Sequence, residues 1–120
     1  MIERIHPPGA PAPRGPYSPA VRAGGFIFVS GQVPQEPGDV ADETRQVLTN
    51  LGLILEACGA SLADVVKCSV FLADGKDFAA MNAVYAEFFG ETRPARTTVV
   101  AAFVLPNIKV EIDAIAYKPS

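Results

Sequence analysis

Apolar residues recur along the chain at a helical spacing in two places. Over residues 40–58 they fall three or four positions apart, which predicts a helix with one buried stripe. Residues 78–89 repeat the pattern and predict a second helix. The expected stripes are Val40, Val47, Leu48, Leu51, Ile54, Leu55 and Cys58, then Phe78, Met81, Val84, Tyr85 and Phe88. Typical caps and stops bound both helices: Asp39 and Asp77 before them, Gly59 and Gly90 after them.

Segments rich in Val, Ile and Thr predict strands over residues 65–72, 94–100 and 110–117. A hairpin is predicted over residues 20–30, because Gly24-Gly25 between two apolar segments can supply the positive φ angles of a two-residue turn. In the segment 65–72 one set of alternating residues is Val66, Cys68, Val70 and Leu72, and the other is Val65, Lys67, Ser69 and Phe71. The segment is thus apolar on much of both faces, which indicates a central strand. A turn at Leu105-Pro106-Asn107 is predicted between the last two strands.

The order hairpin, helix, strand, helix and two strands predicts one α+β domain over residues 1–120. We expect a mixed β-sheet with two helices packed on one face. No repeat or linker interrupts the chain, and residues 7–19, rich in Pro and Gly, are predicted to be loop. Because no helix is left for the other face of the sheet, we expect self-association to cover it.

Composition narrows the possible partners. Half of the 120 residues are hydrophobic (49%), the formal net charge is −3, and the ten Lys and Arg residues are scattered. This pattern argues against a nucleic-acid partner and against an electrostatic membrane anchor. The charged, proline-rich N-terminal segment lacks the apolar core of a secretory leader, and no apolar run is long enough to span a bilayer. We therefore expect a cytoplasmic protein with no membrane partner.

The residue types for metal or thiol chemistry are sparse. Cys58 and Cys68 both fall at apolar positions, so we expect two reduced, buried thiols. The only histidine is His6, and no Cys, His and carboxylate cluster has the spacing of metal ligands. We expect neither a metal nor an organic cofactor.

Two opposite charges stand among the apolar residues of the last two predicted strands. Arg96 shares its face of the strand with Thr98, while Glu111 points away from the core face of its own strand. An arginine on a rigid strand can hold a carboxylate through two parallel hydrogen bonds, and a glutamate can orient or deprotonate a water. Judged on these residues alone, an ion pair between neighbouring strands is the more common explanation.

Several separated motifs resemble one family. They are Pro94-Ala95-Arg96-Thr97-Thr98 followed by Val110-Glu111-Ile112, together with Gly15-Pro16-Tyr17-Ser18, Val29-Ser30-Gly31-Gln32 and Met81-Asn82-Ala83-Val84-Tyr85. In this order they are similar to the RidA/YjgF/UK114 family of reactive-intermediate deaminases. The interval between Arg96 and Glu111 also matches that family, and the resemblance covers nearly the whole chain.

The resemblance implies a chorismate-mutase-like fold, a homotrimer with clefts between subunits, and small 2-imino or 2-keto acids as ligands. The implied reaction hydrolyses an enamine or imine, such as 2-aminoacrylate or 2-iminobutanoate, to a 2-keto acid and ammonia. Arg96 would hold the substrate carboxylate, Glu111 would orient or activate water, and Thr98 would complete the catalytic group. The implied substrate-binding residues besides Arg96 are Tyr17, Ser30, Gly31 and Asn82.

Structural alternatives exist for several of these residues. Tyr17 could close the edge of the core, Gly31 could simply end a strand, and Asn82 fits a surface amide equally well. The sequence also departs from the family, since Thr98 stands where a cysteine is common and the loop near Gln35 is shorter.

Two other functions therefore remain open. The first is a trimer that binds a keto acid without turnover. The second is a ribonuclease or translation inhibitor, a name attached to some members of the family. It ranks last, because RNA cleavage favours histidines or basic groups around the phosphate and this acidic chain has only His6.

Overall fold

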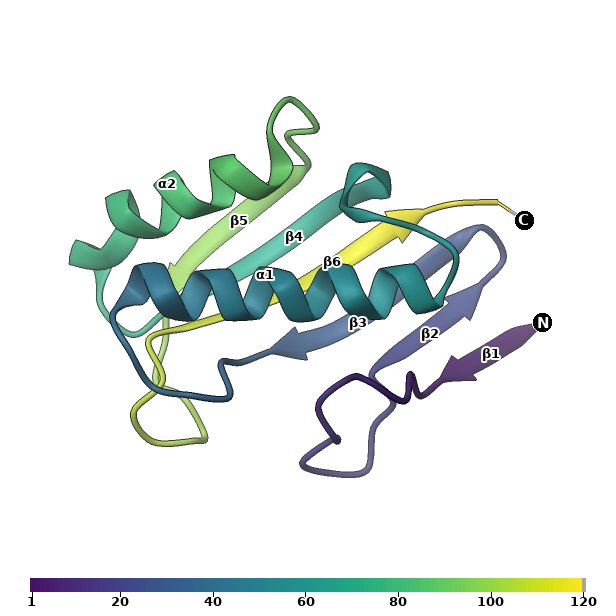
Figure 1. The fold of residues 1–120 in the computed structure, drawn as a ribbon, viewed down its shortest axis with the longest axis horizontal. Coiled ribbons are helices and arrows are strands. Elements are labelled where there is room, and N and C mark those ends of the chain that lie inside the picture. The colour runs from purple at the N-terminus through teal and green to yellow at the C-terminus, as the bar shows by residue number, and fades with distance from the viewer. Residues whose placement is uncertain (120) are drawn as a thin grey trace.

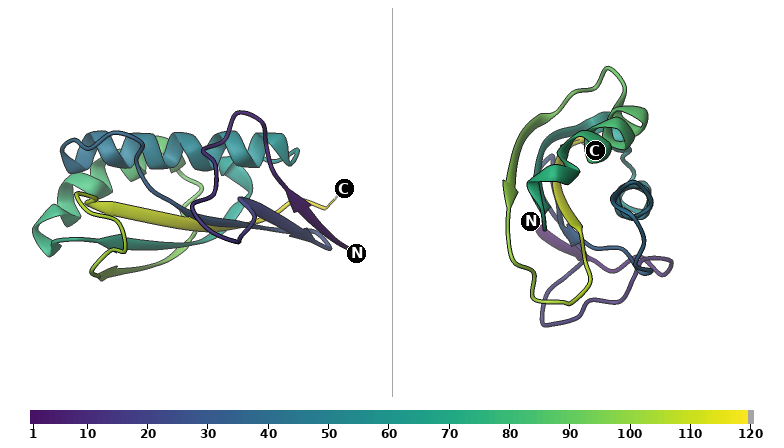
Figure 2. Two further views of the ribbon diagram at one scale, coloured as in Figure 1. Left: turned by 90° about the horizontal axis from the view of Figure 1, so that it is seen from below. Right: turned by 90° about the vertical axis from the view of Figure 1, so that its left-hand side faces the viewer.

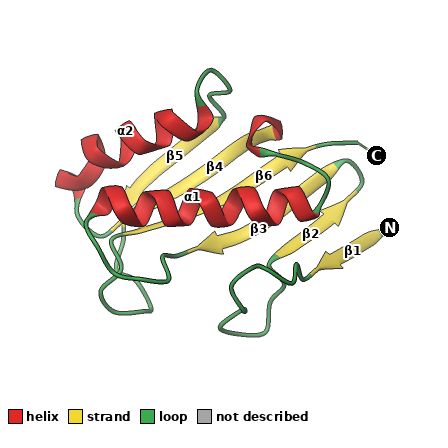
Figure 3. Ribbon diagram, viewed as in Figure 1, coloured by secondary structure: helices red, strands yellow, loops and turns green. Residues whose placement is uncertain are grey.

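The computed structural model describes residues 1–119, in which six strands form one sheet in the order β1-β2-β3-β6-β4-β5 (Figures 1 and 3). Both helices lie on the same face of this sheet and the opposite face is bare (Figure 2). The α+β class and the two-helix layer are thus confirmed. The elements are β1 (Ile2–Ile5), β2 (Ala20–Ala23), β3 (Phe26–Gln32), α1 (Val40–Ala57), β4 (Val65–Leu72), α2 (Phe78–Phe89), β5 (Ala95–Val100) and β6 (Val110–Tyr117), with 3-10 turns at Leu62–Asp64 and Gly75–Asp77.

The last strand of the chain enters the middle of the sheet. β6 pairs antiparallel with both β3 and β4, and β4 pairs parallel with β5. Consequently β4 separates β5 from β6, although these two follow each other in sequence. An ion pair between neighbouring strands is therefore wrong as an account of Arg96 and Glu111, because their strands are not neighbours and no ion pair joins them.

Helix α1 forms the main core layer, packed over β3 and β6. The carboxylate of Asp39 accepts a hydrogen bond from the backbone N–H of Asp42 at 2.8 Å, as an N-cap should. The predicted apolar stripe of this helix is buried along its whole length. Cys58, at its end, and Cys68, on β4, are also buried and unlinked, and burial raises the pKa of both thiols.

The start of α2 differs from the prediction. Phe78 is 46% exposed because it lies over β5, an edge strand with no further strand to cover the ring. At the other end of the helix Phe88 is partly buried and packs against the core, as expected, and Phe89 beside it is buried more fully. Asp77 stands at the N-cap but accepts no capping hydrogen bond, since its backbone continues the preceding 3-10 turn. Asp74 instead caps that turn, accepting from the N–H of Lys76 at 2.9 Å.

Two strands also depart from expectation. β4 is central, as predicted, but Val66 is 45% exposed and Val65 is buried. The pairing of β4 with β6 shifts register between Val65 and Lys67, which turns Val65 into the core. β1 was not predicted, because Ile2–Ile5 alternates poorly and lies at an exposed edge.

The bare face of the sheet carries large apolar side chains. Phe26, Phe28 and Tyr117 are each more than 40% exposed and form one cluster, with ring centroids 5.0 Å apart for Phe26–Tyr117 and 6.4 Å apart for Phe26–Phe28. Val99 on β5 is 44% exposed. Large apolar side chains exposed on one face in this way typically mark a protein–protein contact. None of the helices in residues 1–119 is both long and apolar enough to cross a bilayer.

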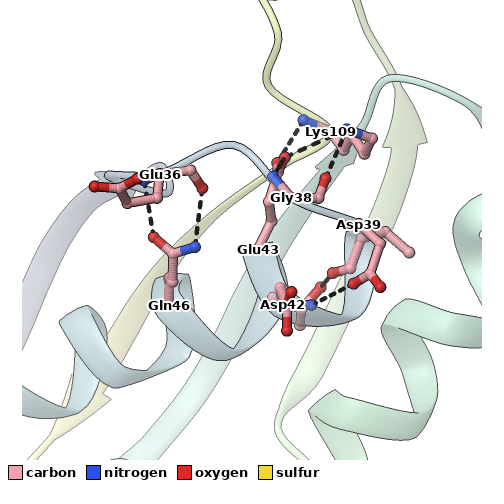
Figure 4. A network of polar contacts seen from close by, with 9 residues as sticks. Glu36, Gly38, Asp39, Asp42, Glu43, Gln46 and Lys109 are labelled. Atoms are coloured by element: carbon pink, nitrogen blue, oxygen red, sulfur yellow. Dashed lines mark hydrogen bonds and ion pairs between the residues drawn. The ribbon is translucent and has the colours of Figure 1, made fainter.

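A buried carboxylate fastens the short loop before α1 to the start of β6 (Figure 4). Glu43 is fully buried, and it accepts the backbone N–H of Gly38 at 3.1 Å and that of Lys109 at 2.8 Å. The ammonium of Lys109 lies 3.5 Å from the same carboxylate. Gln46 holds the other side of the loop through the backbone of Glu36. This network fixes the position of β6 two residues before Glu111.

Removing the Glu43 carboxylate should destabilise the fold. Glu43→Ala leaves two buried N–H groups unpaired, so the free energy of unfolding should fall by about 2–4 kcal/mol. Glu43→Gln keeps one acceptor oxygen and should cost less. Urea denaturation at fixed protein concentration measures both changes. Glu87→Ala, which removes an exposed partner of Arg45, is the control and should leave stability nearly unchanged. Equal losses for Glu43 and Glu87 would contradict the prediction.

Candidate functional site

Strand pairing sends the predicted site residues to opposite faces of the sheet. On β4, Cys68 is buried under the helices, and its register partner on β5 is Arg96. Thr98 pairs with buried Val70 and so shares that face. Glu111 pairs with Phe71, whose side chain alternates with those of Cys68 and Val70 and faces the bare side. Within one chain, therefore, Arg96 and Thr98 lie on one face and Glu111 on the other.

The guanidinium of Arg96 is held by aromatic rings of α2. Its central carbon lies 4.7 Å from the ring centroid of Tyr85 and 5.7 Å from that of Phe78, within the range of cation–π attraction. Arg96 forms no ion pair with any residue between 1 and 119. Arg96 lines a cavity of about 520 Å³, together with Asn82, Tyr85, Ala86, Phe89, Gly90, Arg93 and Pro94. A fixed arginine without an internal carboxylate is well suited to an external one.

Polar atoms without partners surround Arg96. The side-chain oxygens of Asn82, Tyr85 and Thr98 are buried and have no hydrogen-bond partner among the described residues. Burial, with Cys68 alongside, raises the pKa of the Tyr85 hydroxyl, which therefore stays protonated. Buried polar groups are normally paired, and exceptions in a native structure call for an explanation. The structure thus brings Asn82, Tyr85 and Arg96 together around one cavity. Thr98 shares the face of β5 that carries Arg96 but is not among the residues that line this cavity.

Glu111 occupies a second cavity, of about 290 Å³, on the other side of the chain. Its lining includes Tyr17 and Gly31, and its polar and charged members are Arg14, Gln32, Gln35 and Glu111. The loops around Pro13 and Leu105 contribute an apolar wall. The structure therefore brings Tyr17, Gly31 and Glu111 together, apart from the Arg96 group.

Gly31 gives the Glu111 carboxylate its space. A β-carbon on Gly31 would overlap the carboxylate of Glu111. The pairing of β3 with β6 also gains one residue between Val29 and Gln32, a β-bulge centred on Ser30 and Gly31. Glycine is thus required here by the approach of Glu111 itself, and not merely as a strand end.

The environment of Glu111 favours its protonated form. Burial raises the pKa of Glu111, and the neighbouring Asp113 adds to the shift. Asp113 itself accepts a hydrogen bond from the N–H of Ser69 at 3.0 Å. A carboxylate with a raised pKa is a stronger base than an ordinary carboxylate.

Tyr17 and Ser30 are joined through one loop. Tyr17 is 47% exposed, and its hydroxyl accepts the N–H of Arg14 at 3.1 Å. Ser30 does not line the cavity. Its hydroxyl donates to the carbonyl of Ser18 at 2.7 Å, and its N–H donates to the carbonyl of Pro19 at 2.9 Å. Ser30 therefore positions the segment that carries Tyr17.

Two residues that line the Arg96 cavity, Tyr85 and Arg93, were not predicted as site residues. Tyr85 was expected only in the apolar stripe of α2, where it is indeed buried, and Arg93 was expected only to be solvated, as its exposure confirms. A usable signal was present, because Tyr85 follows Asn82 by one helical turn and Arg93 precedes Arg96 by three residues. Within residues 1–119, no group of three His, Cys, Asp or Glu side chains is placed to hold a metal.

Comparison with known proteins gives consistent matches over the whole chain. Residues 8–118 match the family model described as endoribonuclease L-PSP. A RutC family protein of Pyrococcus horikoshii is 51% identical over 98% of this chain and 99% of its own length. The 2-iminobutanoate/2-iminopropanoate deaminase of Escherichia coli K12 is 42% identical over 98% of this chain and 99% of its own. The crystal structure of the yjgF gene product of Escherichia coli superimposes with a TM-score of 0.90 at 42% identity, covering 96% of this chain and 98% of that one.

The contact between Gly31 and Glu111 can be tested by a double-mutant cycle. Gly31→Ala forces the carboxylate aside and should lower the free energy of unfolding by about 1–3 kcal/mol. The same substitution in a Glu111→Ala background should cost clearly less, because the overlapping group is gone. Gly75→Ala is the control, since its new methyl group would meet only Val100, at 3.7 Å. Additive effects of the Gly31 and Glu111 substitutions in urea denaturation would refute the contact.

The raised pKa of Glu111 predicts a pH-dependent stability difference. Proton binding to Glu111 favours the folded state, so this contribution is complete below the ordinary carboxyl pKa and is lost as pH rises through the raised one. Glu111→Gln cannot ionise, and should therefore raise Tm at pH 7.5 by about 1–3 °C, a figure reduced for solvent screening. Calorimetry should show this advantage vanishing near pH 4. A difference that is constant with pH would contradict the assignment.

Proposed function

Since the chain belongs to the endoribonuclease L-PSP family, which includes the RidA/YjgF proteins that its motifs resemble, we propose that it hydrolyses 2-imino acids to 2-keto acids and ammonia. Some relatives are named 2-iminobutanoate/2-iminopropanoate deaminase, at about 42% identity, while others carry only the name RutC family. The observation that carries the proposal is the unpaired Arg96 guanidinium beside the buried oxygens of Asn82, Tyr85 and Thr98.

The complete site is proposed to form between two copies of the chain. Arg96 and Glu111 lie on opposite faces of one sheet, so a single chain cannot bring both to one small molecule. The bare face, with its exposed aromatic cluster, needs cover that this domain does not supply. Closed cyclic symmetry would bring the Arg96 group of one subunit against the Glu111 group of the next. A homotrimer with three such clefts is the proposed assembly.

In the proposed reaction, Arg96 holds the substrate carboxylate with two parallel hydrogen bonds. Glu111 takes a proton from a water molecule as the water oxygen bonds to the imine carbon. The C=N double bond becomes single and its nitrogen takes up a proton, and the resulting carbinolamine then expels ammonia as the carbonyl forms. The oxygens of Asn82 and Thr98 can orient the water or the amino group. Such intermediates already react with water, so positioning and modest proton transfer suffice.

Two other functions compete with this proposal. Thr98 in place of the common cysteine leaves open a protein that binds keto acids without turning over the imine. The family model also bears the name endoribonuclease. We do not propose RNA cleavage, because the net charge is −3 and the only histidine, His6, is exposed and lines neither cavity.

The test couples a dehydratase that generates 2-aminoacrylate or 2-iminobutanoate to detection of the keto acid. Arg96→Ala and Glu111→Gln should each reduce the acceleration at least about 100-fold, the range expected for a lost acid/base group. Arg96→Lys should also be impaired, because it keeps the charge but loses the planar fork. Glu111→Gln should retain keto-acid binding, whereas Arg96→Ala should not.

Mixing the two inactive variants tests the shared site directly. If each site takes Arg96 from one chain and Glu111 from another, refolding the variants together should restore roughly a quarter of the sites by random assembly. A mixture of Arg96→Ala with the double variant Arg96→Ala/Glu111→Gln is the matched control and should restore none. Failure to regain activity in mixed trimers would refute a shared site, and a light-scattering mass of one chain would refute the assembly itself.

A further inference from the structure

Arg93 lines the same cavity as Arg96, at the point where the chain turns from α2 into β5. Its φ angle is 42°, in the left-handed region that residues with a β-carbon seldom adopt. Such strained positions concentrate at ligand-binding sites, where the surrounding structure holds them. The geometry gives Arg93 a fixed backbone at the cavity while its side chain remains exposed.

The cavity carries a strong excess of positive charge. Two guanidinium groups contribute to its lining, and no Asp or Glu is among the lining residues. Within residues 1–119, neither Arg93 nor Arg96 forms an ion pair, whereas Arg45 is paired with Glu87 at 2.6 Å. One carboxylate bound by Arg96 would leave the charge of Arg93 unmatched.

From this arrangement we infer that the site prefers 2-imino acids with a second carboxylate on the side chain, and that Arg93 is the residue that recognises it. The inference rests on the proposed function, in which Arg96 holds the carboxylate next to the reacting carbon. Three residues of extended chain separate the two arginine backbones by at most about 10 Å, a gap that two long side chains can close onto one small molecule. The half-buried Arg96 binds the carboxylate next to the reacting carbon, and the exposed Arg93 binds the carboxylate at the end of the substrate side chain.

The substrate class can be tested with keto-acid products as probes. Calorimetry with 2-oxoglutarate and 2-oxobutanoate compares a dicarboxylate with a monocarboxylate, and competition in the coupled hydrolysis assay repeats the comparison during turnover. The protein should bind 2-oxoglutarate about 3–10-fold more tightly, the range for a solvent-exposed charge pair, and this preference should shrink as salt rises. Arg93→Gln should abolish the preference, because it should weaken the binding of 2-oxoglutarate clearly more than that of 2-oxobutanoate.

Three further variants separate the effect of the Arg93 charge from effects on folding and on the binding of the inner carboxylate. Arg93→Lys keeps the charge and should retain most of the preference, while Arg4→Gln, on exposed β1, should retain all of it. Arg96→Lys should weaken both ligands. Equal binding of the two acids, no binding of either, or an equal loss of both in Arg93→Gln would overturn the inference. A retained preference without imine turnover would instead refute only the proposed reaction.

Discussion

Side-chain alternation across β5, β4 and β6 governs where the chemistry of this chain can occur. Because β4 lies between the other two, the registers of all three strands are locked together, and neighbours in register share a face. Arg96 is in register with Cys68 and therefore lies on the helix face. Glu111 is in register with Phe71 and therefore lies on the bare face. No side-chain rotation can reverse this assignment. The arginine and glutamate of the two C-terminal motifs therefore lie on opposite faces of the sheet, and the proposed function brings them together through a second copy of the chain.

The position of Glu111 depends in turn on two local devices. A bulge at Ser30 and Gly31 turns β3 aside, and the missing side chain of Gly31 leaves room for the carboxylate. The buried Glu43 carboxylate accepts the backbone N–H of Lys109, which fixes the position of the residue that directly precedes β6. A carboxylate confined in this way loses solvent, which is the main cause of its raised pKa. The same close packing around Glu111 therefore fixes the position of its carboxylate and raises its pKa.

Much of this could be predicted from the sequence. The helical stripe of α1, the Asp39 cap and the two-helix layer follow from local periodicity, which one chain segment carries by itself. Pairing of β6 with β3 and β4 could not be predicted, because strand order depends on contacts between distant segments. For the same reason Val66 and Phe78 were misplaced, since a register shift and a sheet edge decide their exposure. Arg93 and Tyr85 were not assigned to the site, because the sequence offers an ordinary structural explanation for each: a solvated arginine and a core aromatic.

Each half of the proposed site is energetically unfavourable in a single chain, because each leaves a charge unmatched: a positive one at Arg96 and a negative one at Glu111. Around Arg96 the chain buries polar oxygens without partners and leaves a guanidinium without a counter-ion. Around Glu111 it partly buries a carboxylate beside a second acid, Asp113, and no ion pair within residues 1–119 neutralises it. A docked neighbour that presents one half to the other would relieve part of both costs, since opposite charges attract more strongly once water is excluded. Assembly and site formation would then stabilise each other, while the exposed aromatic cluster supplies the apolar contact area. On this argument, the features that leave one chain incomplete are the same features that favour its association.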